Sequence, residues 1–319
     1  MEQEGRIKAH IVLVPLCNPI GLGQTLMYHQ SGRFDLFTGR NFNRLINFPL
    51  YERVLAKLKA DPSILSSDGK ANVKTIRVLM TQEIAAYQSN TQVDLLQSTL
   101  VGLAHDADVV LDLHCDEKAV MHTYTLPQLW PQLEPLARYL RSECQILSEN
   151  SGSNAFDEFL STIWLRLSRE FPQANIPLAC FSTTIELRGE GDLQHEWAQT
   201  DAQAIVQYLA HIGAIKLDEQ AIQVMPDLIR EPNPLSGLSY VLAPLAGIAV
   251  YRVHPGDTVT QGQVVADIID PIHQICTPVT TPTDGFVYAV HHANFAQQGT
   301  TLVSVSGAKD LGLGDALGP

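Results

Sequence analysis

A change in residue pattern near residue 225 divides the chain and restricts the folds open to it. Before that point, short apolar runs alternate with segments of helical periodicity. Continuous apolar runs predict strands buried on both faces, and they lie at residues 7–16, 108–113 and 179–187. Helical periodicity covers much of 75–104 and the segments 132–143, 156–171 and 201–215. This alternation predicts a layered α/β domain with a mostly parallel or mixed sheet.

From residue 236 the chain consists of short β-rich runs broken by Gly and Pro. The segment 243–268 is echoed by the segment 281–305, and Gly247 matches Gly285 at an offset of 38 residues. Two hairpin units of this kind predict a small β-barrel or sandwich. We therefore expect a layered domain over 1–225, a β domain over 226–308 and a loose tail over 309–319.

The β repeat resembles the biotinyl/lipoyl-carrier fold, which introduces a carrier function as an alternative to an enzyme. A carrier of this kind needs a lysine at the tip of a hairpin to hold its cofactor. The sequence has no lysine between Lys216 and Lys309. The resemblance therefore predicts the shape of the module and not the carrier function.

Charge and cysteine content restrict partners and compartment. The 319 residues carry a net charge of −13, which argues against nucleic-acid or anionic-membrane partners because both require clustered Lys and Arg. The five cysteines form no C-x-x-C pair, and the chain shows no secretory signal pattern and no apolar run of membrane-spanning length. These features predict free thiols and a cytoplasmic protein.

The sequence DLHCDE, residues 112–117, places potential metal ligands directly at the end of an apolar run. His114 would stand on a rigid strand end, where a neutral imidazole suits zinc and a nearby carboxylate can hold its second ring nitrogen. The alternative is a partly buried histidine with a purely structural role. The motif alone does not choose between the two.

Five elements, taken in order, resemble the succinylglutamate desuccinylase/aspartoacylase family, which has a zinc carboxypeptidase-like fold. They are VPLCNPIGL (14–22), GRFDLFTGRNFNR (32–44), ADVVLDLH (107–114), TTIELRG (183–189) and the terminal repeat. The resemblance covers about residues 7–305. It implies a zinc-dependent amidohydrolase that releases the acyl group from a small N-acyl amino acid.

The resemblance also implies roles for individual residues. His114 matches the third zinc ligand, and Glu186 matches the general base that activates the zinc-bound water. Asn43 and Arg44 match the pair that binds the substrate carboxylate and orients the carbonyl. Arg40 and Arg188 are near matches to which we assign no role.

One part of the family pattern is not found in this chain. The family's first two zinc ligands come from an H-G-x-E segment before the V-P-x-x-N-P strand, whereas only residues 1–9 precede that strand here. We expect this segment either upstream of Met1 or lost. If it is lost, the chain is a degenerate relative that binds a small molecule or acts as a scaffold. A third possibility is a rearranged metal site of His114, Glu117 and His122. The sequence does not choose the acyl group, the amino acid or the oligomeric state.

Overall fold

The computed structural model describes residues 2–45, 47–152 and 154–312. The described residues form two compact units. One, here called the helical unit, comprises Ile11–Asp112 and Glu149–Thr183. The other, here called the β unit, comprises the residues up to His10, Leu113–Ser148 and the residues from Thr184 onward. The predicted boundary at residue 225 concerns independent folding and stays a prediction.

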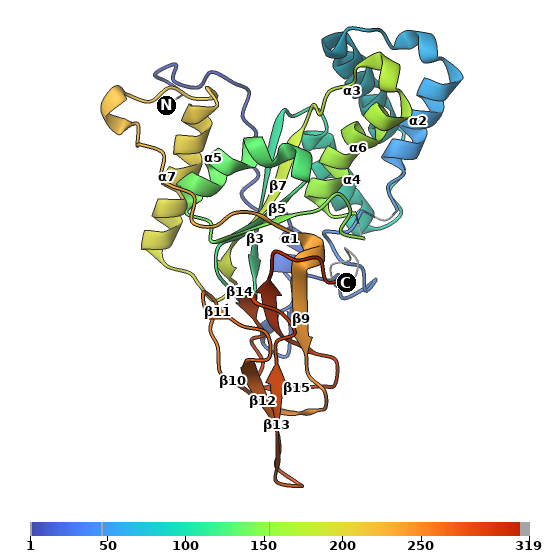
Figure 1. Cartoon of the computed structure of the whole chain (residues 1–319). Helices are drawn as coiled ribbons and strands as arrows, with labels where there is room; N and C mark the ends of the chain where they lie inside the picture. Colours follow the sequence, from blue (N-terminus) through green and yellow to red (C-terminus); the bar gives the residue numbers. More distant parts are fainter. Residues whose placement is uncertain (1, 46, 153, 313–319) are drawn as a thin grey trace. The chain divides into compact units, whose positions relative to one another are not determined.

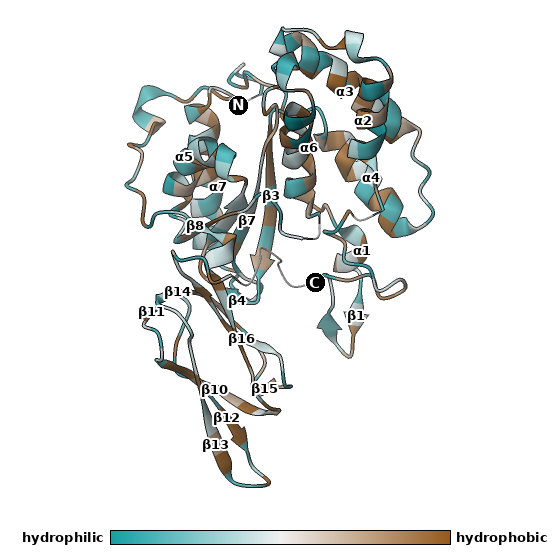
Figure 2. Ribbon diagram, turned by 45° about the vertical axis from the view of Figure 1, so that its right-hand side comes forward, coloured by the Kyte–Doolittle hydropathy of each residue, from teal (hydrophilic) through white to brown (hydrophobic). Residues whose placement is uncertain are grey.

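The helical unit is built from four amphipathic helices, α2 (Leu50–Ala60), α3 (Gly69–Ala85), α4 (Gln92–Ala104) and α6 (Phe156–Glu170). Each ribbon carries both hydrophobic and hydrophilic residues (Figure 2). The apolar sides meet in one core that includes Val54, Leu58, Ile76, Met80, Val101 and Trp164, all at most 1% exposed. Ahead of these helices lie the short helix α1 (Pro19–Leu22) and the two-stranded hairpin of β1 (Thr25–Leu26) and β2 (His29–Gln30).

The predicted helical stretch 75–104 is interrupted, and it forms two helices instead of one. α3 ends at Ala85 and α4 begins at Gln92. Thr91 starts α4 with a capping box, in which its hydroxyl accepts the N–H of Asp94 and the Asp94 carboxylate accepts the N–H of Thr91. A cap of this kind satisfies orphan N–H groups of the first turn, so the helix restarts at that residue.

One mixed sheet has the strand order β3-β7-β5-β6-β8. Its strands are β3 (Val109–Asp116), β5 (His122–Thr125), β6 (Cys144–Leu147), β7 (Phe181–Gly189) and β8 (Asn233–Pro234). β5 is antiparallel to β7 and parallel to β6, and β6 is parallel to β8. The β unit also contains helices α5 (Trp130–Leu140) and α7 (His195–His211). The predicted layered α/β fold with a mixed sheet is confirmed.

The predicted strand over 7–16 is wrong. Ile7 forms only an isolated bridge with Ile215, and no described strand pairs with residues 8–16. Leu13 is 81% exposed and Leu16 is 66% exposed. An apolar run predicts burial only if neighbouring strands cover it, and the described residues supply none here.

The terminal β module, residues 238–306, consists of two antiparallel sheets (Figure 1, orange to red). The first has the order β13-β12-β10-β15 and the second β11-β14-β16-β9, with β4 (Lys118–Ala119) added beside β14. The strands are β9 (Leu238–Leu242), β10 (Gly247–Tyr251), β11 (Thr258–Val259), β12 (Val264–Asp270), β13 (Ile275–Thr280), β14 (Gly285–Val290), β15 (Phe295–Ala296) and β16 (Thr301–Ser306). Their inward residues form a core of small and branched side chains, including Val259, Val265, Ile268, Val287, Leu302 and Val305.

The sequence repeat corresponds to a structural repeat. The segment 243–268 contains β10, β11 and most of β12, and the segment 281–305 contains β14, β15 and most of β16 at matching positions. Gly247 and Gly285 have the same reason to be glycine. A Cβ atom on Gly247 would lie 2.6 Å from the carbonyl oxygen of Ile269, and one on Gly285 would lie 2.6 Å from that of Ser306. Both glycines therefore permit a close approach of two backbones. The remaining regular elements are the 3₁₀ helices η1 (Pro62–Ile64), η2 (Pro127–Leu129), η3 (Pro172–Ala174), η4 (Glu219–Ala221) and η5 (Leu235–Gly237).

Candidate functional site

His114 and Glu186 lie on neighbouring strands of the mixed sheet. His114 is on β3 and Glu186 is on β7, each in the second half of its strand. Backbone hydrogen bonds join the starts of the two strands and also their ends, from Phe181 to Asp108 and from Glu190 to Asp116. The two strands are therefore parallel. Their carboxyl ends meet at one edge of the sheet, where functional residues of such folds gather.

Buried polar side chains of β5 lie near Glu186. Its register partner on β5 is His122, so the two side chains stand on the same face of the sheet. His122 is fully buried, its Nδ1 lies 2.8 Å from the carbonyl oxygen of Val120, and its Nε2 lies 3.7 Å from Oδ2 of Asp116. Burial raises the pKa of Tyr124 well above its ordinary value, and the charges of Glu186 and Asp116 add to that rise. A proton acceptor at Glu186 would thus act in a partly desolvated setting.

The rearranged trio of His114, Glu117 and His122 does not form. The Glu117 carboxylate is turned instead toward His291 and His292, with Oε2 2.5 Å from Nδ1 of His291. Burial raises the pKa of Glu117, but the hydrogen bonds from the two histidines outweigh it and hold that pKa below its ordinary value. Sequence reasoning missed both histidines, although the adjacent pair in the second repeat was a visible signal.

Zinc is the cofactor that the family resemblance implies, and the described residues do not complete a site for it at His114. Among them, the group of three side chains with metal-binding atoms within 4.8 Å of one another is Glu117, His291 and His292. His114 and Glu186 belong to no such group in the described part of the chain. A catalytic zinc needs about three protein ligands, and His114 and Glu186 do not supply that number.

Asn43 and Arg44 lie together in the helical unit. Oδ1 of Asn43 accepts the N–H of Phe156, the first residue of α6, at 2.9 Å. This contact gives Asn43 a structural role at the helix start, besides the substrate role that the resemblance implies.

The Arg44 guanidinium has an N–H donor that makes no hydrogen bond among the described residues. Nη1 donates to the carbonyl of Asn43 at 2.9 Å, while the buried Nε has no hydrogen-bond partner among the described residues. Burial lowers the pKa of Arg44 and the nearby Arg33 lowers it further, whereas Asp157 and Glu158 raise it. A half-buried guanidinium with an unused donor, close to a second cation, suits a carboxylate ligand.

Arg40 and Arg188, the near matches to the family pattern, are held in ion pairs. Arg40 contacts Asp94 at 2.5 Å and donates to Gln97 at 3.0 Å. Arg188 forms a two-pronged pair with Asp201 at 2.8 and 3.0 Å. Both guanidinium groups therefore have structural roles.

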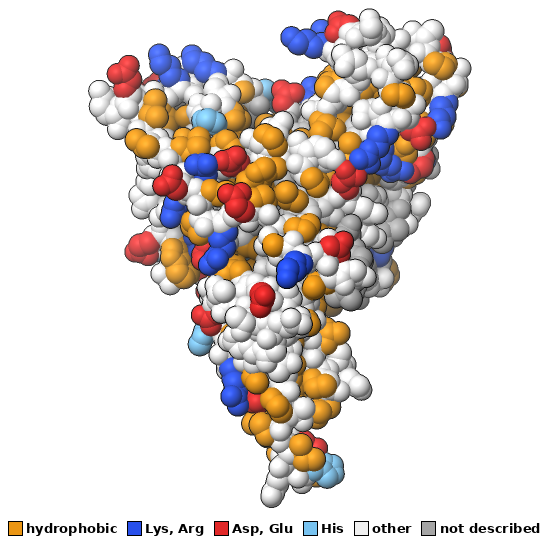
Figure 3. Space-filling view, in the orientation of Figure 1, with side chains coloured by type: hydrophobic (Ala, Val, Ile, Leu, Met, Phe, Trp, Pro, Cys, Tyr) orange, Lys and Arg blue, Asp and Glu red, His pale blue; other side chains and the backbone are white. Residues whose placement is uncertain are grey.

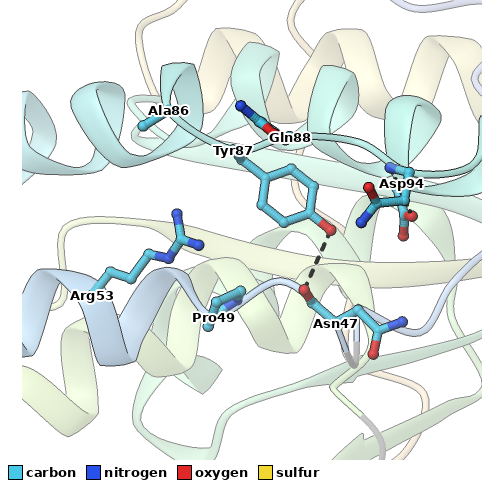
Figure 4. Close-up of a pocket in the computed structure, with 8 residues that line it drawn as sticks. Asn47, Pro49, Arg53, Ala86, Tyr87, Gln88 and Asp94 are labelled. Carbon is cyan, nitrogen blue, oxygen red and sulfur yellow. Dashed lines mark hydrogen bonds between the residues drawn. The ribbon is translucent and has the colours of Figure 1, made fainter.

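A separate polar hollow of about 420 Å³ lies in the helical unit (Figure 4). It is lined by Asn47, Pro49, Arg53, Ala86, Tyr87, Gln88, Asn90 and Asp94. The Tyr87 hydroxyl donates to the carbonyl of Asn47 at 3.3 Å across it. None of the four predicted site residues lines this hollow.

The face drawn in Figure 3 shows acidic and basic side chains interspersed rather than gathered into one large patch. No helix in the described part of the chain is both long and apolar enough to cross a membrane.

Comparisons with known proteins place the fold. Neither a protein-family model nor a curated protein matches the sequence. A protein of Shewanella amazonensis assigned to the succinylglutamate desuccinylase/aspartoacylase family matches with a TM-score of 0.76 and 25% identity, over 91% of this chain and 79% of that one. A protein of Shewanella frigidimarina with a similar assignment matches with a TM-score of 0.74 and 24% identity, over 92% and 78%. A succinylglutamate desuccinylase/aspartoacylase of Rhodobacter sphaeroides matches with a TM-score of 0.56 and 15% identity, over 87% and 71%.

The chain is thus a mixed α/β protein whose fold continues into a terminal β module. Its fold is that of succinylglutamate desuccinylase/aspartoacylase family proteins, which confirms the predicted resemblance and the predicted fold class.

Proposed function

We propose that this chain is a hydrolase of the deacylase type, which releases the acyl group from a small N-acyl amino acid. The observation that carries the proposal is the position of His114 and Glu186 at the carboxyl ends of neighbouring parallel strands. The fold shared with succinylglutamate desuccinylase/aspartoacylase family proteins over 91% of the chain supports it.

Each proposed residue has a chemical task. Glu186 takes a proton from the attacking water and passes it to the leaving amine, which is the work of a carboxylate general base. Arg44 and Asn43 bind the substrate carboxylate, since a guanidinium grips a carboxylate with paired hydrogen bonds. His114 is proposed as a zinc ligand, and zinc, once bound, would supply a Lewis acid. Among the described residues, His114 belongs to no three-ligand group.

The five cysteines are all free, and this agrees with a reducing compartment. We therefore include a cytoplasmic location in the proposal. The proposed ligand is a small molecule, with neither nucleic acid nor membrane as partner.

Turnover of a substrate panel tests the proposal. The purified chain, supplied with Zn²⁺, is mixed with N-acetyl and N-succinyl derivatives of several amino acids, and release of free amino acid is measured. We expect turnover of at least one derivative, and we expect His114→Ala to abolish it. Absence of turnover across the panel in the presence of zinc would contradict a catalytic function for the chain.

A second candidate is a relative that binds an N-acyl amino acid without hydrolysing it, or that serves as a scaffold. It is favoured by the absence of His114 from any three-ligand group among the described residues. Calorimetric titration of the same panel separates the two functions. Binding that depends on Arg44 without release of amino acid would favour the binder.

A further inference from the structure

A carboxylate and two imidazoles distant in sequence meet within the β unit. Glu117 lies in the turn between β3 and β4, and His291 and His292 directly follow β14. Oε2 of Glu117 lies 2.5 Å from Nδ1 of His291 and 3.3 Å from Nδ1 of His292. The backbone N–H of His292 also donates to the same oxygen at 3.1 Å. The β4–β14 pairing, in which Lys118 faces Val290, holds both segments in register.

This donor set matches what zinc and its neighbours in the first transition row bind. Two imidazole nitrogens and one carboxylate oxygen form a common three-ligand zinc set. Ligand atoms about 2.0–2.2 Å from a tetrahedral ion lie roughly 3.3–3.5 Å from one another. The contact between Glu117 and His292 already has that length. The contact between Glu117 and His291 would open by somewhat less than 1 Å when an ion replaces the shared proton.

The three side chains are accessible enough for an ion to reach them. Their exposed fractions are 38% for Glu117, 21% for His291 and 52% for His292. An ion bound here would have room for a water ligand, because all three side chains are partly exposed. Affinity should follow the general order for nitrogen and oxygen ligands, with Zn²⁺ favoured over Mn²⁺.

We propose that Glu117, His291 and His292 form a binding site for a divalent transition-metal ion, which fastens the turn after β3 to the end of β14. The site is separate from the zinc site proposed at His114 and does not depend on it. The ion would cross-link two segments that are 174 residues apart.

The chain contains a matched pair that lacks the third ligand. His273 Nδ1 lies 2.6 Å from Oδ2 of Asp270, which is nearly the same contact as that between His291 and Glu117. This pair belongs to no three-ligand group among the described residues. If a carboxylate–imidazole pair were sufficient for metal binding, His273 would contribute to it as much as His291 does.

Calorimetric titration of the chelator-treated chain with Zn²⁺ tests the proposal, and visible absorption of bound Co²⁺ gives an independent readout. We expect a binding event that is kept in His273→Ala and in His114→Ala, and that is distinct from any zinc held at His114. In His291→Ala and His292→Ala, affinity should fall by more than the 10- to 100-fold that loss of an outer-shell partner typically costs. His291→Gln keeps a hydrogen-bond donor for Glu117 but removes the imidazole, so it should lose the Co²⁺ spectrum while retaining the melting temperature of the metal-free chain.

Two results would overturn the proposal. The first is the absence of Zn²⁺ and Co²⁺ binding in the wild-type chain, which would leave a simple ion pair. The second is binding that persists in His291→Ala and His292→Ala but disappears in His114→Ala, which would place the ion at the other site.

Discussion

At the scale of single residues, an ion pair in the helical unit joins Arg40 to a buried carboxylate, that of Asp94. The Asp94 side chain is only 6% exposed, and it also closes the capping box of α4. Removing one partner of a buried pair leaves the other charge without compensation. Asp94→Asn should therefore lower the free energy of unfolding by about 3 kcal/mol. Urea denaturation measures this, and Asp108→Asn is the control, because Asp108 is 89% exposed in its pair with Arg77 and should lose at most about 1 kcal/mol.

The same pair predicts a pH dependence. Burial raises the pKa of Asp94, but the hydrogen bonds from Arg40 and Thr91 outweigh it, and the net pKa lies below the ordinary value of 3.8. The stabilisation is therefore complete above pH 3.8 and is lost as the pH falls through the lowered pKa of the folded state. The stability difference between wild type and Asp94→Asn should be constant near neutral pH and shrink in acid. A difference that stays undiminished in acid would show that the ionised carboxylate is not its source.

Arg44 carries the residue-scale test of substrate recognition, which rests on the proposed function. Arg44→Ala removes a donor present in both the ground state and the transition state. Loss of one charge-assisted contact should weaken binding of N-acyl amino acids by about 10- to 100-fold. Calorimetry measures this, with Arg53→Ala as the control because Arg53 pairs only distantly with Glu83. Equal affinity of wild type and Arg44→Ala would remove Arg44 from the site.

At the scale of elements, the matched glycines of the β module predict a packing penalty. A Cβ on Gly285 would lie 2.6 Å from a backbone oxygen, which cannot move as a side chain does. Gly285→Ala should therefore cost about 1–3 kcal/mol of stability, and Gly247→Ala should cost a similar amount. Thermal melting checks this against Gly191→Ala, since a Cβ on Gly191 meets nothing within 4 Å. Equal melting temperatures for Gly285→Ala and Gly191→Ala would mean that the two strands can separate without loss.

The terminal module offers a second prediction at this scale. Its apolar core is formed entirely by residues between Val241 and Val305. We predict that residues 226–308 fold alone and melt cooperatively, although they would lose the pairing of β4 with β14 and of β6 with β8. Circular dichroism and calorimetry of that fragment measure this. A fragment without a cooperative transition would make the module dependent on the rest of the β unit.

Some elements could be predicted from the sequence and others could not, and the difference is physical. β3 and β7 lie within three residues of the predicted runs at both ends, because each strand is long, contains apolar residues and is paired in the sheet. The apolar run at 11–16 failed because no described strand covers it. β5 was missed for the opposite reason. His122, Thr123 and Thr125 are polar, yet they lie buried in the interior of the sheet. Sequence periodicity detects apolar residues, whereas burial depends on neighbouring strands that come from elsewhere in the chain.

At the scale of the whole molecule, the order of short motifs along the chain predicted more than composition did. That order implied the fold which the solved structures share with this chain. It could not predict the meeting of Glu117 with His291, because those residues are 174 positions apart and belong to no common motif. Contacts of that range depend on how β4 pairs with β14, which only the folded chain shows.

Glu186 is proposed to act as the proton acceptor in amide hydrolysis, and a comparison of two conservative variants tests that role. Glu186→Gln preserves the size and much of the hydrogen bonding of the side chain but cannot take a proton. We predict that kcat for an N-acyl amino acid falls by about 10²–10⁴-fold in Glu186→Gln. Glu190→Gln, which changes an exposed carboxylate just beyond β7, should keep the wild-type kcat. Near-full activity of Glu186→Gln beside an equally active Glu190→Gln would contradict the claim.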